Sequence, residues 1–157
     1  MKLQISPTKR VEDAMVIWHE KGPEVDLVMD PRGYQGLTMK EGSIKAIYAF
    51  NILGLAEPKQ ILPILENFYR LLEAGGELYV IEMDFDYINR AYLSADLSLA
   101  EFNNDFRRKT YLNQQELVRM MDKIGFPEKE QRAWYDNPQF KKAHYEMIIS
   151  GKKINLQ

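Results

Sequence analysis

Two short apolar runs in the middle of the chain stand on either side of one amphipathic helical segment, and this arrangement restricts the fold most. Residues 44–50 (IKAIYAF) and 77–83 (ELYVIEM) have the length and composition of strands buried in a parallel sheet. Between them, residues 59–72 carry apolar side chains three and four residues apart, which form one stripe on a helix: Ile61, Ile64, Leu65, Phe68 and Leu72. Gly75-Gly76 supplies the backbone freedom for a tight turn before the second strand.

The same alternation of apolar runs and helical periodicity extends over the rest of the chain. Further strands are expected at residues 2–6, 14–18 and 25–29, and Asn113 is expected to cap a helix that ends at Gly125. Residues 84–108 are expected to be helical or irregular, and final strands at residues 132–135 and 143–152 could pair antiparallel. The pattern predicts a Rossmann-like three-layer α/β/α sandwich, whose mostly parallel sheet has an antiparallel C-terminal strand.

Composition excludes several classes of function. The 157 residues are expected to form one domain, residues 1–157. A net charge of −2 gives no electrostatic reason to expect nucleic acid or a membrane as partner. Cysteine is absent and the two histidines lie far apart in the sequence, so no metal site is expected. No apolar stretch is long enough for a leader or a membrane span, and the protein is expected to be soluble and cytoplasmic.

Four segments carry a family pattern in the same order and with about the same spacing. They are residues 42–49 (GSIKAIYA), residues 68–78 (FYRLLEAGGEL), residues 109–126 and the closing residues 144–153. Together they resemble class I S-adenosylmethionine (SAM)-dependent methyltransferases, and in particular small predicted members that begin directly with the cofactor loop. The resemblance covers most of the chain and implies a Rossmann-like fold with SAM at the carboxyl ends of the strands.

The resemblance also implies where SAM would bind, and most residues at these positions depart from the family pattern. The family places a glycine-rich loop after its first strand, whereas this chain has residues 6–9 (SPTK) there and no glycine before Gly22. His19 stands where a carboxylate would bind the ribose hydroxyls, and Asp30 matches the acidic residue near the adenine amino group. If SAM binds, the implied contacts are Ser6, His19, Asp30 and Asn51, the last from the altered segment after the fourth strand. No catalytic residue is identified.

Three further groups of residues have a chemical and a structural interpretation. Glu82, Asp84 and Asp86 could act as acid and base or bind a divalent ion, or they could form a solvated strand end. Residues 107–109 (RRK) could meet phosphate, or they could belong to a solvated face. The isolated His19 and His144 are more often structural residues than general bases.

Two functions from different classes fit these observations. The first is a non-catalytic methyltransferase-like domain without cofactor, which binds or assembles with a protein partner or a second copy; the missing glycine loop and altered site residues favour it. The second is an active SAM-dependent methyltransferase acting on an unknown small molecule or macromolecule, which the order of elements and Asp30 favour. A site for another, nucleotide-like ligand rests on fold analogy alone. The absence of any G-x-G-x-x-G sequence argues against a NAD-dependent dehydrogenase.

Overall fold

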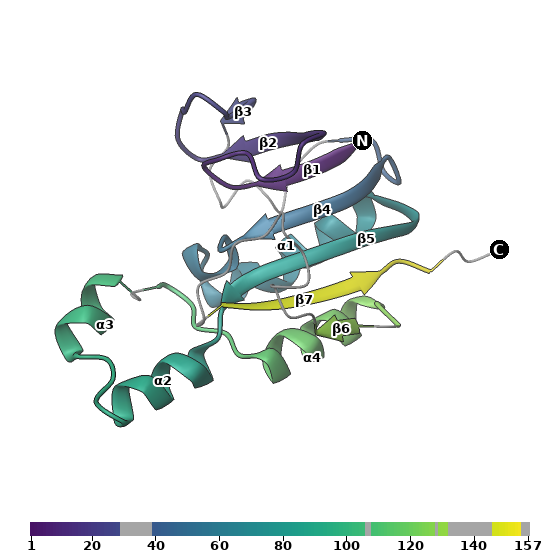
Figure 1. Cartoon of the computed structure of the whole chain (residues 1–157). Helices are drawn as coiled ribbons and strands as arrows, with labels where there is room; N and C mark the ends of the chain where they lie inside the picture. Colours follow the sequence, from purple (N-terminus) through teal and green to yellow (C-terminus); the bar gives the residue numbers. More distant parts are fainter. Residues whose placement is uncertain (29–38, 106–107, 128, 132–145, 155–157) are drawn as a thin grey trace.

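One mixed β-sheet of seven strands organises the part of the chain that the structure describes (Figure 1). The structure is a computed structural model and describes residues 1–28, 39–105, 108–127, 129–131 and 146–154. The strand order is β3-β2-β1-β4-β5-β7-β6, with parallel pairing from β3 to β5 and antiparallel pairing of β7 with both neighbours. This arrangement confirms the expected Rossmann-like fold with a mostly parallel sheet and an antiparallel C-terminal strand.

Most strands lie where the apolar runs predict them. Their bounds are β1 Lys2–Ile5, β2 Ala14–Trp18, β3 Leu27–Val28, β4 Ile44–Phe50, β5 Leu72–Met83, β6 Lys129–Gln131 and β7 Glu146–Lys152. The bounds of β2 and β4 agree with the predicted ones, whereas β3 is shorter. The strand that pairs antiparallel with β7 is β6, just before the predicted segment 132–135, which lies outside the described residues, as do residues 143–145.

β5 begins earlier than predicted, because the chain remains paired with β4 around Gly75-Gly76. Leu72 pairs with Ile44 and Glu77 pairs with Ala46, so residues 73–76 bulge out between these two pairs. Gly75 has a φ of +80°, a left-handed value that favours glycine, and its N–H donates to the Lys153 carbonyl at 2.8 Å. The prediction of a special backbone at this site was right, but the prediction of a turn was wrong.

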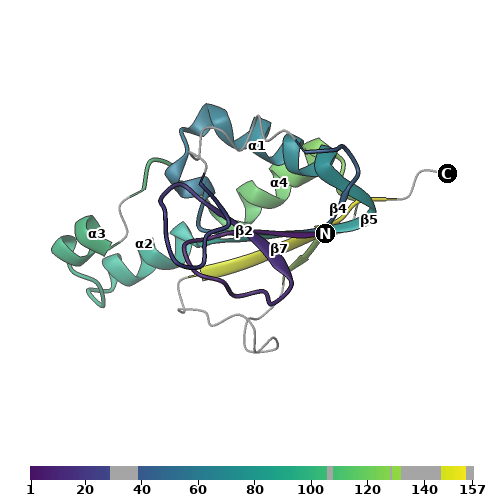
Figure 2. The same ribbon diagram turned by 90° about the horizontal axis from the view of Figure 1, so that it is seen from above.

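Two helices pack on the same face of the sheet, and two others extend away from it (Figures 1 and 2). The helices are α1 Pro58–Leu71, α2 Phe85–Leu93, α3 Leu99–Asp105 and α4 Gln114–Ile124, with a short 3-10 turn, η2, at Leu53–Leu55. α1 and α4 contact each other and cover β5 and β7, whereas α2 and α3 lie beyond the carboxyl end of β5. In the described part of the chain, helices therefore cover one face of the sheet.

The ends of α4 confirm the predicted caps. Asn113 Oδ1 accepts a hydrogen bond from the Glu116 N–H at 2.8 Å, and Gly125 ends the helix with a φ of +112°.

α1 contains a proline past its first turn, since the helix begins at Pro58 and includes Pro63. A residue with an N–H at position 63 would donate to the Lys59 carbonyl. This carbonyl lies in the exposed first turn, where water can replace the missing bond.

α1 has 14 residues, and no helix among the described residues is long and apolar enough to cross a bilayer.

The sheet is buried on both faces, which explains the continuous apolar runs. Alternate residues of β4 divide between two clusters: Ile47 and Ala49 pack in the cluster that contains the apolar stripe of α1, while Phe50 lies in the opposite one. In the described part of the chain, that opposite cluster is completed by Val11, from the connection between β1 and β2, and not by a helix.

We expect Gly151→Ala to lower the free energy of unfolding by roughly 1–3 kcal/mol, the usual cost of overpacking. A Cβ at Gly151 would lie 2.6 Å from Met121 Cε and 2.8 Å from Phe126 Cδ1, so the side chains that pack on β7 here would have to shift. Urea denaturation checks this. Gly22→Ala is the matched control, because its Cβ would meet its nearest atom at 3.5 Å, an ordinary contact. Equal midpoints for the two variants would contradict close packing of α4 on β7.

Candidate functional site

The strand order places the switch point of the sheet between β1 and β4; the region outside their carboxyl ends, next to Ser6 and Asn51, is called the crevice. β1 pairs with β2 on one side and with β4 on the other, so the connections leave in opposite directions at this point. In open α/β sheets, ligands bind outside the carboxyl ends of the strands at such a switch point. Ser6 follows β1 and Asn51 follows β4, so the structure places two of the four predicted site residues at this crevice.

The loop after β1 is held by two buried side chains, those of Gln4 in β1 and of Ser6 directly after it. Gln4 Nε2 donates to Ser6 Oγ and to the Thr8 carbonyl, the latter at 2.7 Å. Gln4 Oε1 accepts from the N–H groups of Arg10 at 2.9 Å and Val11 at 2.8 Å, and Ser6 Oγ donates to the Thr8 carbonyl at 2.6 Å. These hydrogen bonds use the polar groups of both side chains to hold the loop that follows.

This loop connects two parallel strands without a helix. Residues 6–13 lead from β1 to β2, whereas such crossovers usually need a dozen or more residues and contain a helix. Val11 is buried, and the Arg10 guanidinium lies 5.0 Å from the centroid of the Phe50 ring. The crossover therefore supplies no helix N-terminus that could face a ligand at the crevice.

Asn51 links the end of β4 to β7. It has a φ of +55°, its N–H donates to the Ile81 carbonyl at 2.7 Å, and its Nδ2 donates to Glu146 Oε2 at 3.0 Å. Its buried Oδ1 finds no hydrogen-bond donor among the described residues. The left-handed backbone is one that asparagine tolerates better than most residues.

Glu82 is a buried carboxyl group, which overturns its interpretation as part of a solvated strand end. It is 2% exposed, and its Oε1 accepts from the N–H groups of Leu53 at 2.7 Å and Gly54 at 3.4 Å. Burial raises the pKa of Glu82 to about 7, against the lowering effect of these two donors and of Arg108; Glu146 adds to the rise. The sequence signal for this role is the position of Glu82 inside the apolar run of residues 77–83.

Arg108 and Gly54 form a close contact beside this carboxyl group. A Cβ on Gly54 would lie 3.0 Å from Arg108 Cδ, and the Gly54 carbonyl accepts from the N–H groups of Lys109 and Thr110 at 2.9 and 3.2 Å. Arg108 is half-buried, which overturns the solvated-face interpretation for this residue of the basic run, while Lys109 is exposed and Arg107 lies outside the described residues.

The other predicted residues do not gather at the crevice. Asp84 caps α2 by accepting from the Asp86 N–H at 3.1 Å, and burial raises its pKa. His19 follows β2 and packs against the Trp18 ring at 4.2 Å between centroids; its buried Nδ1 has no hydrogen-bond partner among the described residues. Asp30 and His144 lie outside the described residues. Within those residues, no group of three His, Asp or Glu side chains is arranged to hold a metal ion.

Solved structures with the same fold include several SAM-dependent methyltransferases. One from Archaeoglobus fulgidus has a TM-score of 0.67 at 11% identity, over 96% of this chain and 85% of that one. One from Methanosarcina mazei has a TM-score of 0.61 at 14% identity, over 97% and 91%. One from Thermotoga maritima, described as a possible histamine N-methyltransferase, has a TM-score of 0.61 at 18% identity, over 83% and 65%.

These likenesses establish the fold of a SAM-dependent methyltransferase for this chain. No protein-family model matches the sequence, and no curated protein matches it either. The chain spans less than two thirds of the Thermotoga protein and of some other neighbours. The fold thus agrees with the family resemblance of the sequence, while the loop after β1 differs from the glycine loop that the resemblance implies.

We expect Gln4→Leu to lower the free energy of unfolding by roughly 2–4 kcal/mol, because each buried polar group left unpaired costs about 1–3 kcal/mol. Leucine is similar in size, so the loss reports the hydrogen bonds to Thr8, Arg10 and Val11. Urea denaturation measures the change. Gln115→Leu, at an exposed position of α4, is the matched control and should change stability by no more than about 0.5 kcal/mol. Similar losses in both variants would contradict the role assigned to Gln4.

We expect Glu82→Gln to remove a pH dependence of stability. Because the pKa of Glu82 is raised to about 7, the native state keeps a proton that the unfolded state releases at lower pH. The free energy of unfolding of the wild type should therefore fall as the pH rises from about 5 to above 7, by at most about 3 kcal/mol. In the variant the amide oxygen can accept the same hydrogen bonds, so the fold should be kept. Because the amide does not titrate, this fall in the free energy of unfolding should be absent.

Urea denaturation across this pH range measures the effect of Glu82→Gln. Glu66→Gln, on the exposed face of α1, is the matched control and should keep the wild-type pH dependence. If Glu82→Gln also keeps it, then Glu82 is ionised in the native state throughout the range.

Proposed function

We propose that this chain, which has the fold of a SAM-dependent methyltransferase, is a non-catalytic member of that fold class and serves as a binding or assembly protein. The observation that carries the proposal is the connection between β1 and β2. Residues 6–13 form a loop held by the buried Gln4 and Ser6, at the place where the fold class holds its cofactor.

The residues after β1 do not fit SAM. A ligand at this position needs a backbone that it can approach closely and N–H groups free to bond it. Ser6 is 1% exposed, and the Arg10 and Val11 N–H groups already donate to Gln4. Pro7 has no N–H to offer. SAM could enter only if it displaced these interactions, which the chain uses to close its shortened crossover.

The position after β2 supports the same proposal. A carboxylate can accept hydrogen bonds from both hydroxyls of a ribose, whereas a neutral imidazole has one acceptor nitrogen. The chain has His19 at this position, with Glu20 next to it and 3.8 Å from His19 Nε2. The exchange removes the usual recognition of the SAM ribose. We therefore assign no cofactor, and with a net charge of −2 we expect the partner to be a protein and not a nucleic acid.

The alternative is an active SAM-dependent methyltransferase with an unusual loop. It is favoured by the strand order and by the similarity to methyltransferases of known structure. In this alternative, Asp30 would still contact the adenine, as the family resemblance implies.

Titration with SAM and with S-adenosylhomocysteine separates the two functions. We expect neither compound at millimolar concentration to shift the melting temperature or to give heat in calorimetry. A ligand present at one hundred times its Kd would stabilise the native state by about 2.7 kcal/mol, which is easily measured. A stabilisation that the wild type shows and Asp30→Ala loses would establish the SAM site and overturn the proposed function.

A further inference from the structure

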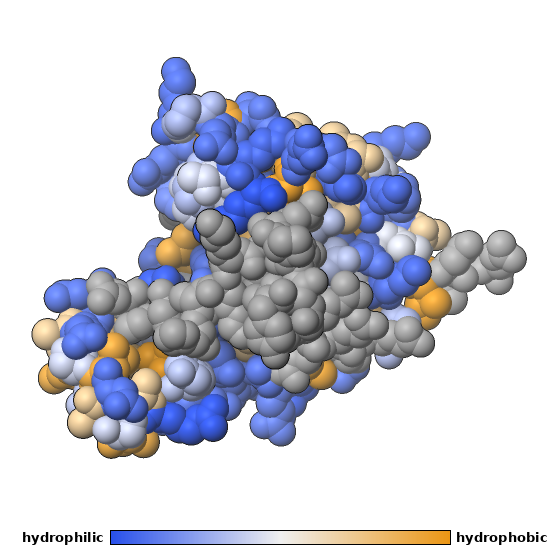
Figure 3. Space-filling view, viewed as in Figure 1, coloured by the Kyte–Doolittle hydropathy of each residue, from blue (hydrophilic) through white to orange (hydrophobic). Residues whose placement is uncertain are grey.

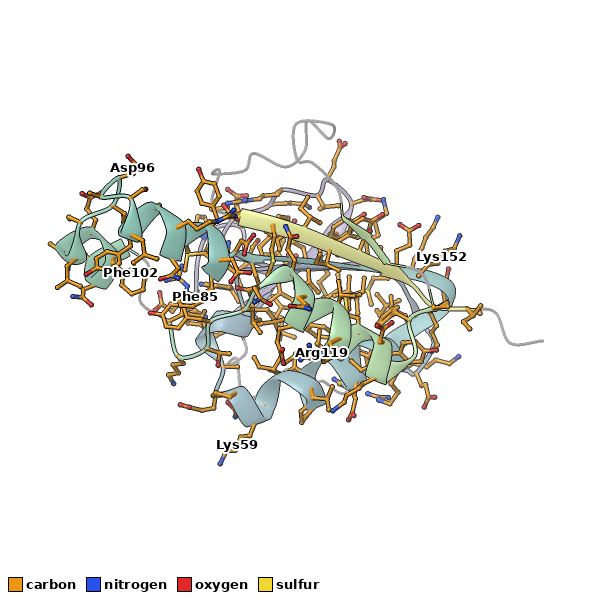
Figure 4. All side chains as sticks on the ribbon, turned by 90° about the horizontal axis from the view of Figure 1, so that it is seen from below. Lys59, Phe85, Asp96, Phe102, Arg119 and Lys152 are labelled. Carbon is orange, nitrogen blue, oxygen red and sulfur yellow. The ribbon has the colours of Figure 1, made fainter. Side chains whose placement is uncertain are left out.

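α2 and α3 form an arm that projects from the carboxyl end of the sheet, as Figure 1 shows. The arm is residues 85–105, and a small apolar cluster joins it to the domain. This cluster consists of Met83, Ile88 and Leu97, with Ala91 and Phe102 packed against it. In Figure 4, the labelled Asp96 and Phe102 lie on the arm, far from Lys152 at the end of β7. The arm is thus separate from the crevice between β1 and β4.

The arm exposes large apolar side chains where its two helices meet. Leu93 ends α2 and is 74% exposed, Leu99 begins α3 and is 59% exposed, and Tyr92 next to Leu93 is exposed as well. The connection between the helices is residues 94–98, so these side chains share the outer end of the arm. We call residues 92–101 the tip of the arm. Exposed apolar surface of this kind commonly marks an interaction site.

The tip is acidic as well as apolar. It contains Asp96 and Glu101 and no basic residue. The whole arm has four acidic residues and one basic residue, Arg90, which gives it a net charge of −3. Because the whole chain carries −2, the residues outside the arm together carry +1. Negative charge is therefore concentrated on the segment that exposes apolar side chains, and Figure 3 shows hydrophobic and hydrophilic side chains next to one another at this end of the molecule.

The two carboxylates of the tip are available to a partner. Both are exposed, and neither forms an ion pair with a described residue. Asp96 accepts a hydrogen bond from Ser94 Oγ at 2.8 Å, and Glu101 lies in the first turn of α3, where a negative charge also favours the helix dipole. Unpaired negative charges beside exposed leucines are complementary to a partner that carries positive charges next to apolar side chains.

The structure of the arm favours a helix as the binding element of that partner. α2 has 9 residues and α3 has 7, whereas isolated helices shorter than about 12–15 residues are marginal in water and depend on packing. Within the described part of the arm, no strand offers an edge to an extended peptide. A hollow of about 340 Å³ makes the surface of α2 concave next to the tip; it is lined by Tyr87, Arg90, Ala91, Ser94 and Asp96. An amphipathic helix that packs on such a surface buries the apolar side chains of both partners.

We propose that the tip of the arm is the docking surface for a basic, amphipathic helix of a partner protein. The apolar face of this helix covers Leu93 and Leu99, and lysine or arginine residues along its border meet Asp96 and Glu101. Burial of the leucines supplies affinity, while the complementary charges set the orientation and discriminate against acidic partners.

The charge of the tip distinguishes this partner from two other occupants. A membrane surface that contains anionic lipids would repel the acidic tip. A second tip, packed on the first in a two-fold contact, would place like charges next to one another.

The inference names the kind of partner that the proposed binding function needs, and for its biological role it rests on that proposed function. Docking of a helix and binding of SAM are measured separately. A chain that binds both would overturn the proposed function alone, and a chain that binds neither would overturn the docking surface alone.

Fluorescence anisotropy with a designed peptide and the full chain tests the proposal. The probe is a labelled helix of leucine and lysine, about 18 residues long, with its leucines on one face. Two control peptides each keep one of its properties: the first has glutamate in place of lysine, and the second has the same composition in an order without an apolar face. We expect saturable binding of the probe alone, and we expect added salt to weaken it.

Variants make the test specific to the tip. Leu93→Ser should weaken binding of the probe about tenfold, and Glu101→Gln should weaken it roughly two- to fivefold. Arg90→Gln removes the one cation of the arm and should strengthen binding. Ile154→Ser and Glu66→Gln, at exposed positions outside the arm, are the matched controls for Leu93 and Glu101 and should bind as the wild type does.

Several outcomes would overturn the proposal. They are no binding of the probe, equal binding of either control peptide, and probe binding that Leu93→Ser leaves unchanged. A dimer in sedimentation equilibrium, or binding to phosphatidylcholine vesicles, would also overturn it if Leu93→Ser abolished that association, because the tip would then have another occupant. Leu93 is mostly exposed, so the variant should keep its fold, and circular dichroism checks that.

Discussion

The hydrogen bonds of the buried Gln4 side chain hold the loop after β1, and the proposed function of this domain depends on that loop. The Gln4 amide bonds the backbone of Thr8, Arg10 and Val11, and so it closes a helix-free crossover between two parallel strands. The remaining sheet is that of a complete methyltransferase fold, in strand order and in direction. The sheet keeps the strand order of this fold class, and the short loop after β1 lies at the place where the class holds its cofactor.

Polar residues after β4, near the end of β5 and at the start of β7 form a second set of structural contacts at the same end of the sheet. Asn51 binds Glu146, Glu82 binds the backbone of η2, and Arg108 packs on Gly54. Each of these contacts holds one element against another. Polar groups at the carboxyl ends of parallel strands usually serve ligands. Here they stabilise the turn after β4, which is consistent with a domain whose strand ends have structural duties.

Several site residues could be found from the sequence, but their roles could not. The apolar runs predicted β2 and β4 with their observed bounds, because a strand buried on both faces leaves a continuous apolar signal. The departure from the glycine loop was visible as well. For Glu82 the sequence leaves a chemical role and a solvated strand end open, and only its partners across the fold, Leu53 and Gly54, reveal its burial. Gly75-Gly76 predicted unusual backbone, but pairing with β4 converted the expected turn into a bulge.

By itself the sequence determined the fold class, the caps of α4 and the positions where the methyltransferase pattern is altered, since these depend on local periodicity and residue type. The tertiary structure decided how the residues after β1 are held, because the hydrogen bonds from Arg10 and Val11 to Gln4 follow no periodic pattern of the sequence. It also decided which apolar residues stay exposed. Leu93 and Ile88 are similar in sequence terms, and only the direction in which α2 leaves β5 buries one and exposes the other.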